Sequence, residues 1–442
     1  MVAALAGPLG LRAGSHTTGA SASVTTAAGS LGGASARHTR RRVQRSTRAG
    51  RPKADSPALA RLGRLLGHQL RIAGRESGAL VVDLSSGQTL FWSQAGIRRP
   101  PASVEKLWTT VATLRRLGPR VRLHTTLLGT GAERGGVWHG NIYLRGGGDP
   151  TFGDTAFDQA WYADLGPTPN ELARQLLARG IHRVTGRLYA DESLFDQRRG
   201  GLLTGQLADL PDLAGQLSAL TFDHGATARH YNPATFAARE VALTLHDSGI
   251  RVNASGHDAR TPRGARLLAI ISSPPISALL RFMDVPSDDL IAELLAKQLG
   301  VLFGAGGTIG AGADVIEQTI ASDYDLHPKI LDGSGLSLRD RSSPLEIVDL
   351  LRKVTGTQVG RVLEASLPTV GRNGTVQGIA DNTAAAGNCS AKTGTLDNVS
   401  NLAGYCMARG RHKLAFAIFV DGPTNAAAIP LIGRMVADIA RY

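Results

Sequence analysis

The sequence predicts a mixed α/β (α+β) fold in which both ends of the chain build one domain and a strand-rich segment is inserted between them. Three features predict it: a strand hairpin precedes a helix near the beginning, the chain ends in strands followed by a helix, and short strands dominate from about residue 121. This order differs from the strand–helix alternation typical of a parallel sheet. We expect a composite domain from residues 57–120 and 268–442, an inserted domain at residues 121–267, and a tail at residues 1–56.

The first part of the composite domain opens with a predicted helix over residues 57–74, in which leucines recur on one side. Residues 78–84 and 89–92 are predicted strands joined by a Ser-Ser-Gly turn. An amphipathic helix follows, because its apolar residues recur with the spacing i, i+3, i+4 and i+7. Those residues are Val104, Leu107, Trp108, Val111 and Leu114.

The remaining elements are predicted from the same periodicities. In the insertion, strands are expected at 123–129, 140–144, 184–190 and 240–245, and a helix at 169–179. In the second part of the composite domain, helices are expected at 277–282, at about 286–299 and at 345–355. The chain is expected to end in strands at 389–395, 402–407 and 414–420 and a helix at 426–440.

The formal net charge of +13 is concentrated in the N-terminal tail. Residues 1–54 contain nine of the 49 basic residues and none of the 36 acidic ones. Ser, Thr, Gly and Ala dominate residues 15–36 and arginine dominates residues 37–53, a composition that cannot bury a core and predicts disorder. The Arg37–Lys53 run is a candidate for binding an anionic polymer or a membrane surface, without specificity for nucleic acid, and a solvated linker is the alternative.

The sequence gives only weak indications of export, of a membrane-spanning helix and of a disulfide bond. The first ten residues lack a basic n-region and are interrupted by Gly7-Pro8, so they resemble a secretory signal poorly. The chain has no apolar run of 18 or more residues, and we expect no spanning helix. Cys389 and Cys406 flank a predicted hairpin, which allows either a cross-strand disulfide or two buried free thiols.

A serine and a lysine at the start of the 103–114 helix form a candidate nucleophilic pair. Ser103 and Lys106 are three residues apart and therefore share a helix face. A serine hydroxyl needs an adjacent base, and a lysine becomes one when burial or a neighbouring positive charge lowers its pKa. The alternative, that Ser103 is a helix N-cap, is weakened because Lys106 stands where a capping box has Glu or Gln.

Lysine usage supports this interpretation. Only seven of the 49 basic residues are lysines, so the composition prefers arginine, which cannot act as a base. Two of these seven lysines lie in short motifs, Lys106 in Ser-Val-Glu-Lys and Lys392 in Lys-Thr-Gly. Coincidence on a small count is the alternative.

The sequence lacks the motifs of a phosphate-binding loop, a metal site and a nucleophile elbow. The Gly-Gly-Gly-Asp-Pro run at 146–150 is not followed by Gly-Lys-Ser/Thr, so we interpret it as a turn and not as a phosphate-binding loop. The twelve histidines show no metal-ligand spacing, and we expect neither a metal site nor a cofactor. The sequence contains no Gly-x-Ser-x-Gly, which argues against a nucleophile elbow.

Ser287-Asp288-Asp289 opens a predicted helix, and taken alone it is typical of an N-cap. The order Ser-x-x-Lys, Ser-Asp-Asn-like and Lys-Thr-Gly is, however, the signature of penicillin-binding proteins and serine β-lactamases. Together with Gly146–Thr151, Asp191–Asp196 and Asp332–Ser337, these segments make the chain similar to the D-alanyl-D-alanine carboxypeptidase/endopeptidase family. This family is the DacB type of low-molecular-mass penicillin-binding proteins, peptidase family S13.

The resemblance implies a β-lactamase/transpeptidase-like domain, with extra domains inserted between the first and second motifs, and an acyl-enzyme mechanism. It implies that Ser103 attacks a D-Ala–D-X peptide bond, that Lys106 takes its proton, and that Ser287 and Lys392 relay a proton to the leaving amine. The Lys392 strand would dock the substrate, with Gly394 allowing close approach. Lys392, Thr393 and Thr395 would hold the terminal carboxylate, and the N–H groups of Ser103 and Thr395 would form the oxyanion hole.

The chain departs from the family pattern at Asp289, where Asn is expected. An ionised Asp only accepts hydrogen bonds, and its charge favours the protonated form of nearby lysines. We therefore expect slower acylation than in a typical member. The predicted function is a serine DD-peptidase that hydrolyses D-Ala–D-X bonds of peptidoglycan stem peptides or cross-links through an acyl-enzyme on Ser103, and that β-lactams acylate. The alternative is a catalytically impaired, penicillin-binding relative with a cell-wall-binding or sensing role. The resemblance also implies an extracytoplasmic location.

Overall fold

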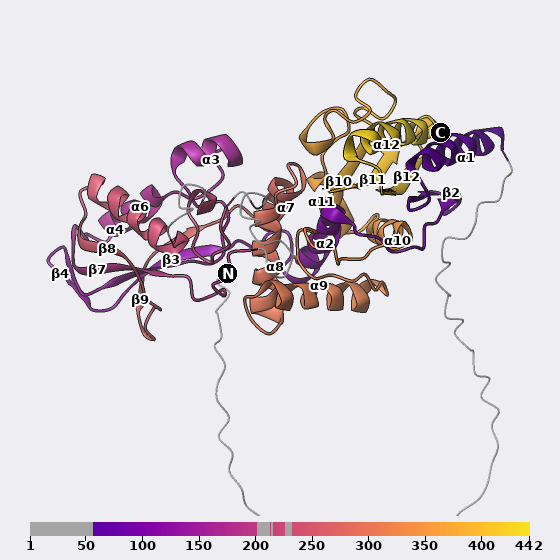
Figure 1. The fold of residues 1–442 in the computed structure, drawn as a ribbon. Helices are drawn as coiled ribbons and strands as arrows, with labels where there is room; N and C mark the ends of the chain where they lie inside the picture. Colours follow the sequence, from indigo (N-terminus) through magenta and orange to yellow (C-terminus); the bar gives the residue numbers. More distant parts are fainter. Residues whose placement is uncertain (1–55, 201–212, 214, 226–231) are drawn as a thin grey trace, which may run out of the picture. The chain divides into compact units, whose positions relative to one another are not determined.

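The computed structural model describes residues 56–200, 213, 215–225 and 232–442 (Figure 1). Apart from Ser56, the predicted tail and its Arg37–Lys53 run lie outside the described residues. Within the described part of the chain, no helix has both the length and the apolar composition that crossing a bilayer requires.

The predicted mixed α/β fold is confirmed by a five-stranded antiparallel sheet that joins the two ends of the chain. Its strand order is β10-β11-β12-β1-β2. The strands are β1 (Gly78–Asp83), β2 (Thr89–Ser93), β10 (Cys389–Leu396), β11 (Val399–Met407) and β12 (Lys413–Asp421). Figure 1 shows the indigo N-terminal elements beside the yellow C-terminal ones, and the contact is made by β1 pairing with β12. β10 lies at the edge of this sheet.

Helices cover both faces of the five-stranded sheet. Successive side chains of a strand point to opposite faces. Those of Ala79 and Val81 pack with α1 (Pro57–Ala73) and α12 (Asn425–Ala440), and those of Leu80 and Val82 pack on the face covered by α2 (Lys106–Arg116) and α10 (Pro344–Val354). Burial on both sides explains why β1 is a continuous apolar run. The remaining helices of this domain are α7 (Ile276–Asp284), α8 (Asp289–Phe303), α9 (Ile309–Tyr324) and α11 (Gln358–Ser366).

A second, seven-stranded sheet is formed by the segment between the first and second motifs. Its strand order is β4-β5-β7-β6-β3-β9, and β8 also pairs with β7. The strands are β3 (His124–Gly129), β4 (Ala132–Arg134), β5 (Val137–His139), β6 (Ile142–Arg145), β7 (Arg183–Asp191), β8 (Arg251–Asp258) and β9 (Arg266–Ser272). Among the described residues of this segment, the helices are α3 (Thr155–Tyr162), α4 (Pro169–Ala178) and α6 (Pro233–Asp247). α4 and α6 supply apolar side chains to the core of this sheet.

The strand β9 crosses the domain boundary expected between residues 267 and 268. Its whole length pairs with β3, from His124 opposite Ser272 to Gly129 opposite Arg266. We therefore propose that the inserted domain extends to Ser272, so that the second part of the composite domain begins after this residue.

The strand predicted at residues 240–245 is wrong, because this segment lies within helix α6. The Asn232 side chain caps α6 by accepting hydrogen bonds from the backbone N–H groups of Ala234 and Thr235, and a proline occupies the first turn. Val241 and Leu245 are four residues apart and both are buried, which is the helical period. The short apolar run fitted either period, and the cap upstream determines the helix.

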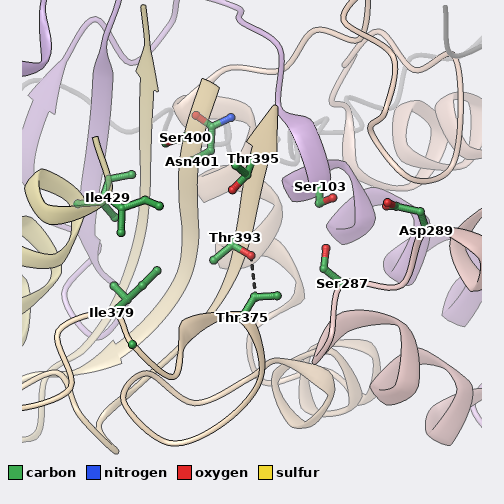
Figure 2. Close-up of a pocket in the computed structure, with 12 residues that line it drawn as sticks. Ser103, Ser287, Asp289, Thr375, Ile379, Thr393, Thr395, Ser400, Asn401 and Ile429 are labelled. Atoms are coloured by element: carbon green, nitrogen blue, oxygen red, sulfur yellow. Dashed lines mark hydrogen bonds between the residues drawn. The ribbon is translucent and has the colours of Figure 1, made fainter. Parts of the chain in front are cut away.

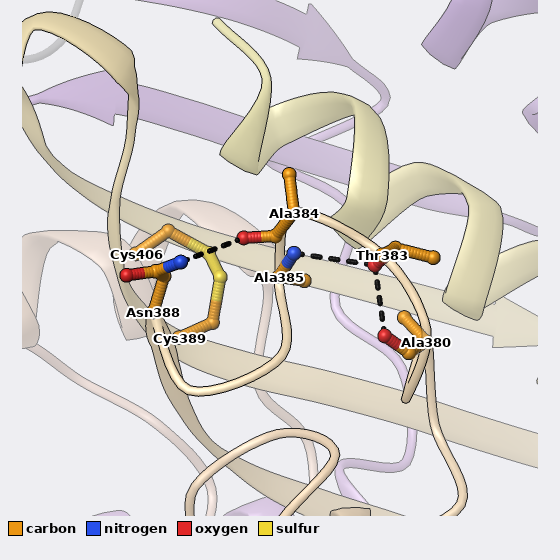
Figure 3. Close-up of a disulfide and its surroundings, with 7 residues drawn as sticks. All are labelled: Ala380, Thr383, Ala384, Ala385, Asn388, Cys389 and Cys406. Carbon is orange, nitrogen blue, oxygen red and sulfur yellow. Dashed lines mark hydrogen bonds between the residues drawn. A yellow bond between two sulfur atoms is a disulfide. The ribbon is translucent and has the colours of Figure 1, made fainter.

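A disulfide joins Cys389 and Cys406, the first of the two alternatives that the sequence allowed (Figure 3). The two residues are direct partners in the register of β10 and β11. The bond closes the hairpin at the end opposite to its Asp397-Asn398 turn. It therefore fixes the register of the strand that carries the Lys-Thr-Gly motif.

Candidate active site

Ser103 lies in a short 3₁₀ turn, η1 (Ala102–Glu105), that leads into helix α2. The turn is anchored by Val104, which is fully buried in the core under the sheet. Ala102 has a φ of 48°, a left-handed conformation that is costly for a residue with a side chain. The backbone next to the candidate nucleophile is therefore held in a strained conformation by the packing around it.

Lys106, at the start of α2, is fully buried and contacts three hydrogen-bond acceptors. Its Nζ atom lies 3.0 Å from Ser103 Oγ, 2.5 Å from Asp289 Oδ1 and 2.8 Å from the carbonyl oxygen of Ser334. A lysine ammonium has three protons to donate, so these contacts satisfy the charged form completely. The Asp289 carboxylate thus stabilises the state of Lys106 that cannot accept a proton from Ser103.

The cap of helix α8 is Asp288 and not Ser287. The Asp288 side chain accepts a hydrogen bond from the N–H of Ile291 at 2.8 Å. Ser287 stands before the cap with a φ of 68°, and its Oγ atom accepts a hydrogen bond from Lys392 Nζ at 2.7 Å. The capping role is taken by a neighbour, which leaves the Ser287 hydroxyl available in the site.

Lys392, on the edge strand β10, is fully buried behind Ser287. Burial, and after it the positive charge of Lys106, lower the pKa of Lys392 from 10.5 to about 7, although the carboxylates of Asp284 and Asp289 oppose the shift. A lysine that titrates near neutral pH can both donate and accept a proton. The Ser287–Lys392 pair is therefore suited to a proton relay.

One cavity of about 460 Å³ brings the predicted residues together (Figure 2). Its lining includes Ser103, Ser287, Asp289, Thr393 and Thr395. Figure 2 shows Ser103 and Ser287 on one side and Thr393 and Thr395, from β10, on the other. Lys106 and Lys392 lie behind the two serines that they contact.

The packing of β10 against the nucleophile turn requires glycine at position 394. A Cβ atom at this position would lie 2.4 Å from the carbonyl oxygen of Pro101 and 3.0 Å from the backbone nitrogen of Val104. Strand β10 therefore packs directly against the nucleophile turn, and only glycine allows this distance. Asn401, on the neighbouring strand β11, holds the same turn by donating from Nδ2 to the carbonyl oxygens of Pro100 and Pro101, at 3.0 and 2.9 Å.

A loop at Asp332–Ser337, here called the support loop, lies under Lys106 and the nucleophile turn. Asp332 accepts hydrogen bonds from the backbone N–H groups of Ser334, Gly335 and Ser337. From α8, Glu293 accepts from the N–H groups of Gly333 and Ser334. These contacts present the Ser334 carbonyl oxygen to Lys106. A Cβ atom on Gly335 would lie 2.0 Å from the carbonyl oxygen of Ala102, so the loop also supports the strained turn.

Two positions in this region were not identified from the sequence. Asn401 acts on residues about 300 positions earlier, a contact for which the sequence offers no signal. Thr375 lines the cavity, and its hydroxyl is 2.7 Å from that of Thr393 (Figure 2). The support loop coincides with the Asp-Gly-Ser-Gly-Leu-Ser segment that was part of the family resemblance, but its contacts with Lys106 depend on tertiary structure.

Replacing Glu293 with glutamine is expected to reduce the dependence of stability on pH. Burial, and after it the Asp332 carboxylate, raise the pKa of Glu293 from 4.5 to about 8. Between these values the folded chain keeps a proton that the unfolded chain releases, so the free energy of unfolding of the natural chain falls as pH rises. The variant lacks this contribution, which is on the order of 5 kcal/mol across the whole window. Urea unfolding of both proteins on either side of this pH window measures the difference; equal losses would contradict the prediction.

Comparisons with known proteins agree with this geometry. Residues 60–203 and 209–441 match the model of the D-Ala-D-Ala carboxypeptidase 3 (S13) family. The chain is 30% identical over 380 residues to carboxypeptidase DacB of Mycolicibacterium smegmatis, covering 80% of this chain and 79% of the relative. It is 27% identical to the D-alanyl-D-alanine carboxypeptidase of Actinomadura sp. (strain R39), over 84% of this chain and 82% of the relative.

A solved structure has the same fold. Penicillin binding protein 4 (dacB) from Haemophilus influenzae superposes with a TM-score of 0.72 at 20% sequence identity, covering 85% of this chain and 99% of that one. The family resemblance found in the motifs is thus confirmed, and the chain belongs to the D-Ala-D-Ala carboxypeptidase 3 (S13) family.

Proposed function

We propose that this chain is a serine DD-peptidase that hydrolyses D-Ala–D-X bonds of peptidoglycan stem peptides or cross-links through an acyl-enzyme on Ser103. The observation that supports it most directly is the 3.0 Å contact between Ser103 Oγ and Lys106 Nζ at an open cavity. Among the relatives, the names include D-alanyl-D-alanine carboxypeptidases, and one solved structure of this fold is a penicillin G acylated endopeptidase from Bdellovibrio bacteriovorus.

The substrate would dock along the edge of β10. The first part of this edge is covered, because Ala391 N–H donates to Pro368 O at 3.0 Å and Val370 N–H donates to Cys389 O at 2.9 Å. From Lys392 to Leu396, no described segment other than β11 forms backbone hydrogen bonds with the strand. An extended peptide can add to this open stretch as a further strand. The scissile carbonyl would then lie between the strand and Ser103.

In the first half-reaction, the Ser103 oxygen attacks the carbonyl carbon of D-Ala while its proton passes to the neutral amine of Lys106. The N–H groups of Ser103 and Thr395 stabilise the oxyanion. When the C–N bond breaks, the leaving amine takes a proton from the Ser287 hydroxyl, which Lys392 replaces. Water then attacks the ester carbon and gives a proton to the Ser287–Lys392 pair, while Lys106 returns its proton to the departing Ser103 oxygen, so that the starting state of the site is restored. The hydroxyls of Thr393 and Thr395 bind the terminal carboxylate of the substrate.

The test is to identify the acylated residue and the released product. Purified protein is incubated with penicillin, and the adduct is located by peptide mapping and mass spectrometry; the same protein is given a stem pentapeptide, and free D-Ala is measured. We expect one adduct, on Ser103, and release of D-Ala. An adduct on another residue, or no adduct and no release, would refute the proposed function.

A second candidate function rests on the contact between Asp289 and Lys106. Because this carboxylate stabilises the protonated lysine, the site can bind a D-Ala–D-Ala terminus while turning it over slowly. A penicillin adduct on Ser103 without release of D-Ala would support this impaired, wall-binding role.

We also propose an extracytoplasmic location, which agrees with the disulfide, since such bonds persist in oxidising compartments. Cell fractionation tests the location.

A further inference from the structure

The seven-stranded sheet of the inserted domain carries α4 and α6 on one face and exposes the other. Successive side chains of β7 alternate between the two faces. Val184 and Leu188 lie in the core with α4 and α6, whereas Arg183 and Arg187 are exposed on the opposite face. Figure 1 shows α4 and α6 on the same side of this sheet. The opposite face is here called the open sheet face.

Four exposed arginines from three neighbouring strands gather on the open sheet face. They are Arg145 of β6, Arg183 and Arg187 of β7, and Arg251 of β8. Among the described residues, none of these four side chains has a hydrogen-bond or ion-pair partner. Asp191 also belongs to this face, but it is buried, and its carboxylate accepts hydrogen bonds from the backbone N–H groups of Ser193 and Thr261. The guanidinium groups are therefore free to bind an anion from solution.

Two of these arginines stand directly opposite each other. Arg183 and Arg251 are partners in the parallel register of β7 and β8, so their side chains leave the sheet on the same face. Like charges at directly opposite positions of a sheet destabilise it. An anion bound between the two guanidinium groups would remove this repulsion and accept hydrogen bonds from both. The pair is thus an independent argument for an anionic ligand.

Apolar side chains are exposed on the same face. The strands β8, β7, β6, β3 and β9 are neighbours in this order, so their open side is continuous. On β9, Leu267 and Ile270 are 46% and 39% exposed. Their partners on β3 are Leu128 and Thr126, which flank the core residue Leu127 and therefore lie on the open side. Basic and apolar side chains on one face suit a bilayer surface, where charges bind phosphate groups and apolar groups enter the acyl boundary.

We propose that the open sheet face docks on a phospholipid surface that carries anionic head groups. The four arginines bind the phosphate groups, and Leu267 and Ile270 enter the boundary between head groups and acyl chains. A soluble polyanion would use the arginines and leave the two apolar side chains in water, so these side chains favour the bilayer. The face lies outside the Ser103 cavity, and the inference does not depend on the peptidase reaction.

The test is co-sedimentation of the full chain with vesicles of equimolar phosphatidylglycerol and phosphatidylcholine, and with vesicles of phosphatidylcholine alone. In every protein compared, serine replaces the basic residues of the Arg37–Lys53 run, so that this run does not contribute. We expect binding to the anionic vesicles only, weakened by salt. The double variant Arg183→Glu/Arg187→Glu should lower the partition coefficient at least about ten-fold, because attraction becomes repulsion.

The matched control is Arg174→Glu/Arg179→Glu, which makes the same change of charge at exposed positions of and next to α4, on the other side of the sheet. It should change binding by less than about two-fold in physiological salt. The melting temperature of each variant reports whether its fold is intact. Absence of binding to the anionic vesicles, or equal losses in the two double variants, would overturn the inference.

A second pair of variants distinguishes a bilayer from a soluble polyanion. We expect Leu267→Ser/Ile270→Ser to weaken vesicle binding several-fold and to leave binding of soluble polyphosphate unchanged. Leu243→Ser is its control, since Leu243 is 50% exposed on α6 and lies away from the open sheet face. If the apolar variant bound vesicles as well as its control did, the face would be a site for soluble polyanions and the bilayer proposal would be wrong.

Discussion

Replacing Lys106 with methionine is expected to slow the acylation of Ser103 by at least about a thousand-fold, because the hydroxyl loses its base. Methionine keeps most of the length and volume of the lysine, so the change removes mainly the nitrogen that contacts Ser103, Asp289 and Ser334. The second-order rate constant for formation of the penicillin adduct measures the effect.

The chain offers a matched control in Lys297, on α8. Like Lys106, it is fully buried and forms an ion pair of 2.5 Å, in this case with Asp196. Lys297→Met therefore removes the same chemical group from an equally buried position that does not line the Ser103 cavity. We expect both variants to lose stability, and only Lys106→Met to lose acylation. If both slowed acylation equally, a general effect of removing a buried charge would explain the result, and the role of Lys106 as base would be refuted.

The order of the motifs could be predicted from the sequence because each motif is local. Ser103 and Lys106 share a helix face, and a single strand carries Lys392, Thr393 and Gly394. The sequence also predicted the hairpin that places Cys389 opposite Cys406. Whether those cysteines are bonded could not be decided, since the same register accommodates two thiols.

The contacts that determine the state of the site could not be predicted. Local sequence did not decide whether Ser287 or Asp288 caps α8, because both are good N-cap residues. The choice follows from the positive φ of Ser287 and from its contact with Lys392, more than 100 residues away. The support loop and Asn401 likewise act on the nucleophile turn only after the chain has folded. The requirement for glycine at position 394 has the same origin, because β10 packs closely against the nucleophile turn, which is far away in the sequence.

Replacing Asp289 with asparagine is expected to accelerate acylation about ten-fold near neutral pH. The Asp289 carboxylate lies 2.5 Å from Lys106 Nζ, and this ion pair must be weakened before the lysine can take a proton. Asparagine keeps an acceptor at the same place and removes the charge, which weakens the interaction that Lys106 gives up when it takes the Ser103 proton. The second-order rate constant for formation of the penicillin adduct, measured for both proteins near neutral pH, tests this expectation.

Asp288→Asn separates the effect of contact from the effect of net charge. Asp288 stands next to Asp289 and caps α8 through Ile291, and asparagine is an equally good cap, so the helix keeps its start. Asp288 makes no hydrogen bond to Lys106. We therefore expect Asp288→Asn to change acylation much less than Asp289→Asn does. Equal acceleration by the two variants would mean that the summed negative charge at the start of α8, and not the direct contact with Asp289, slows the proton transfer to Lys106. Slower acylation by Asp289→Asn would instead mean that the Asp289 carboxylate assists proton transfer. Asparagine, the residue of the family pattern, would then not give faster acylation in this chain.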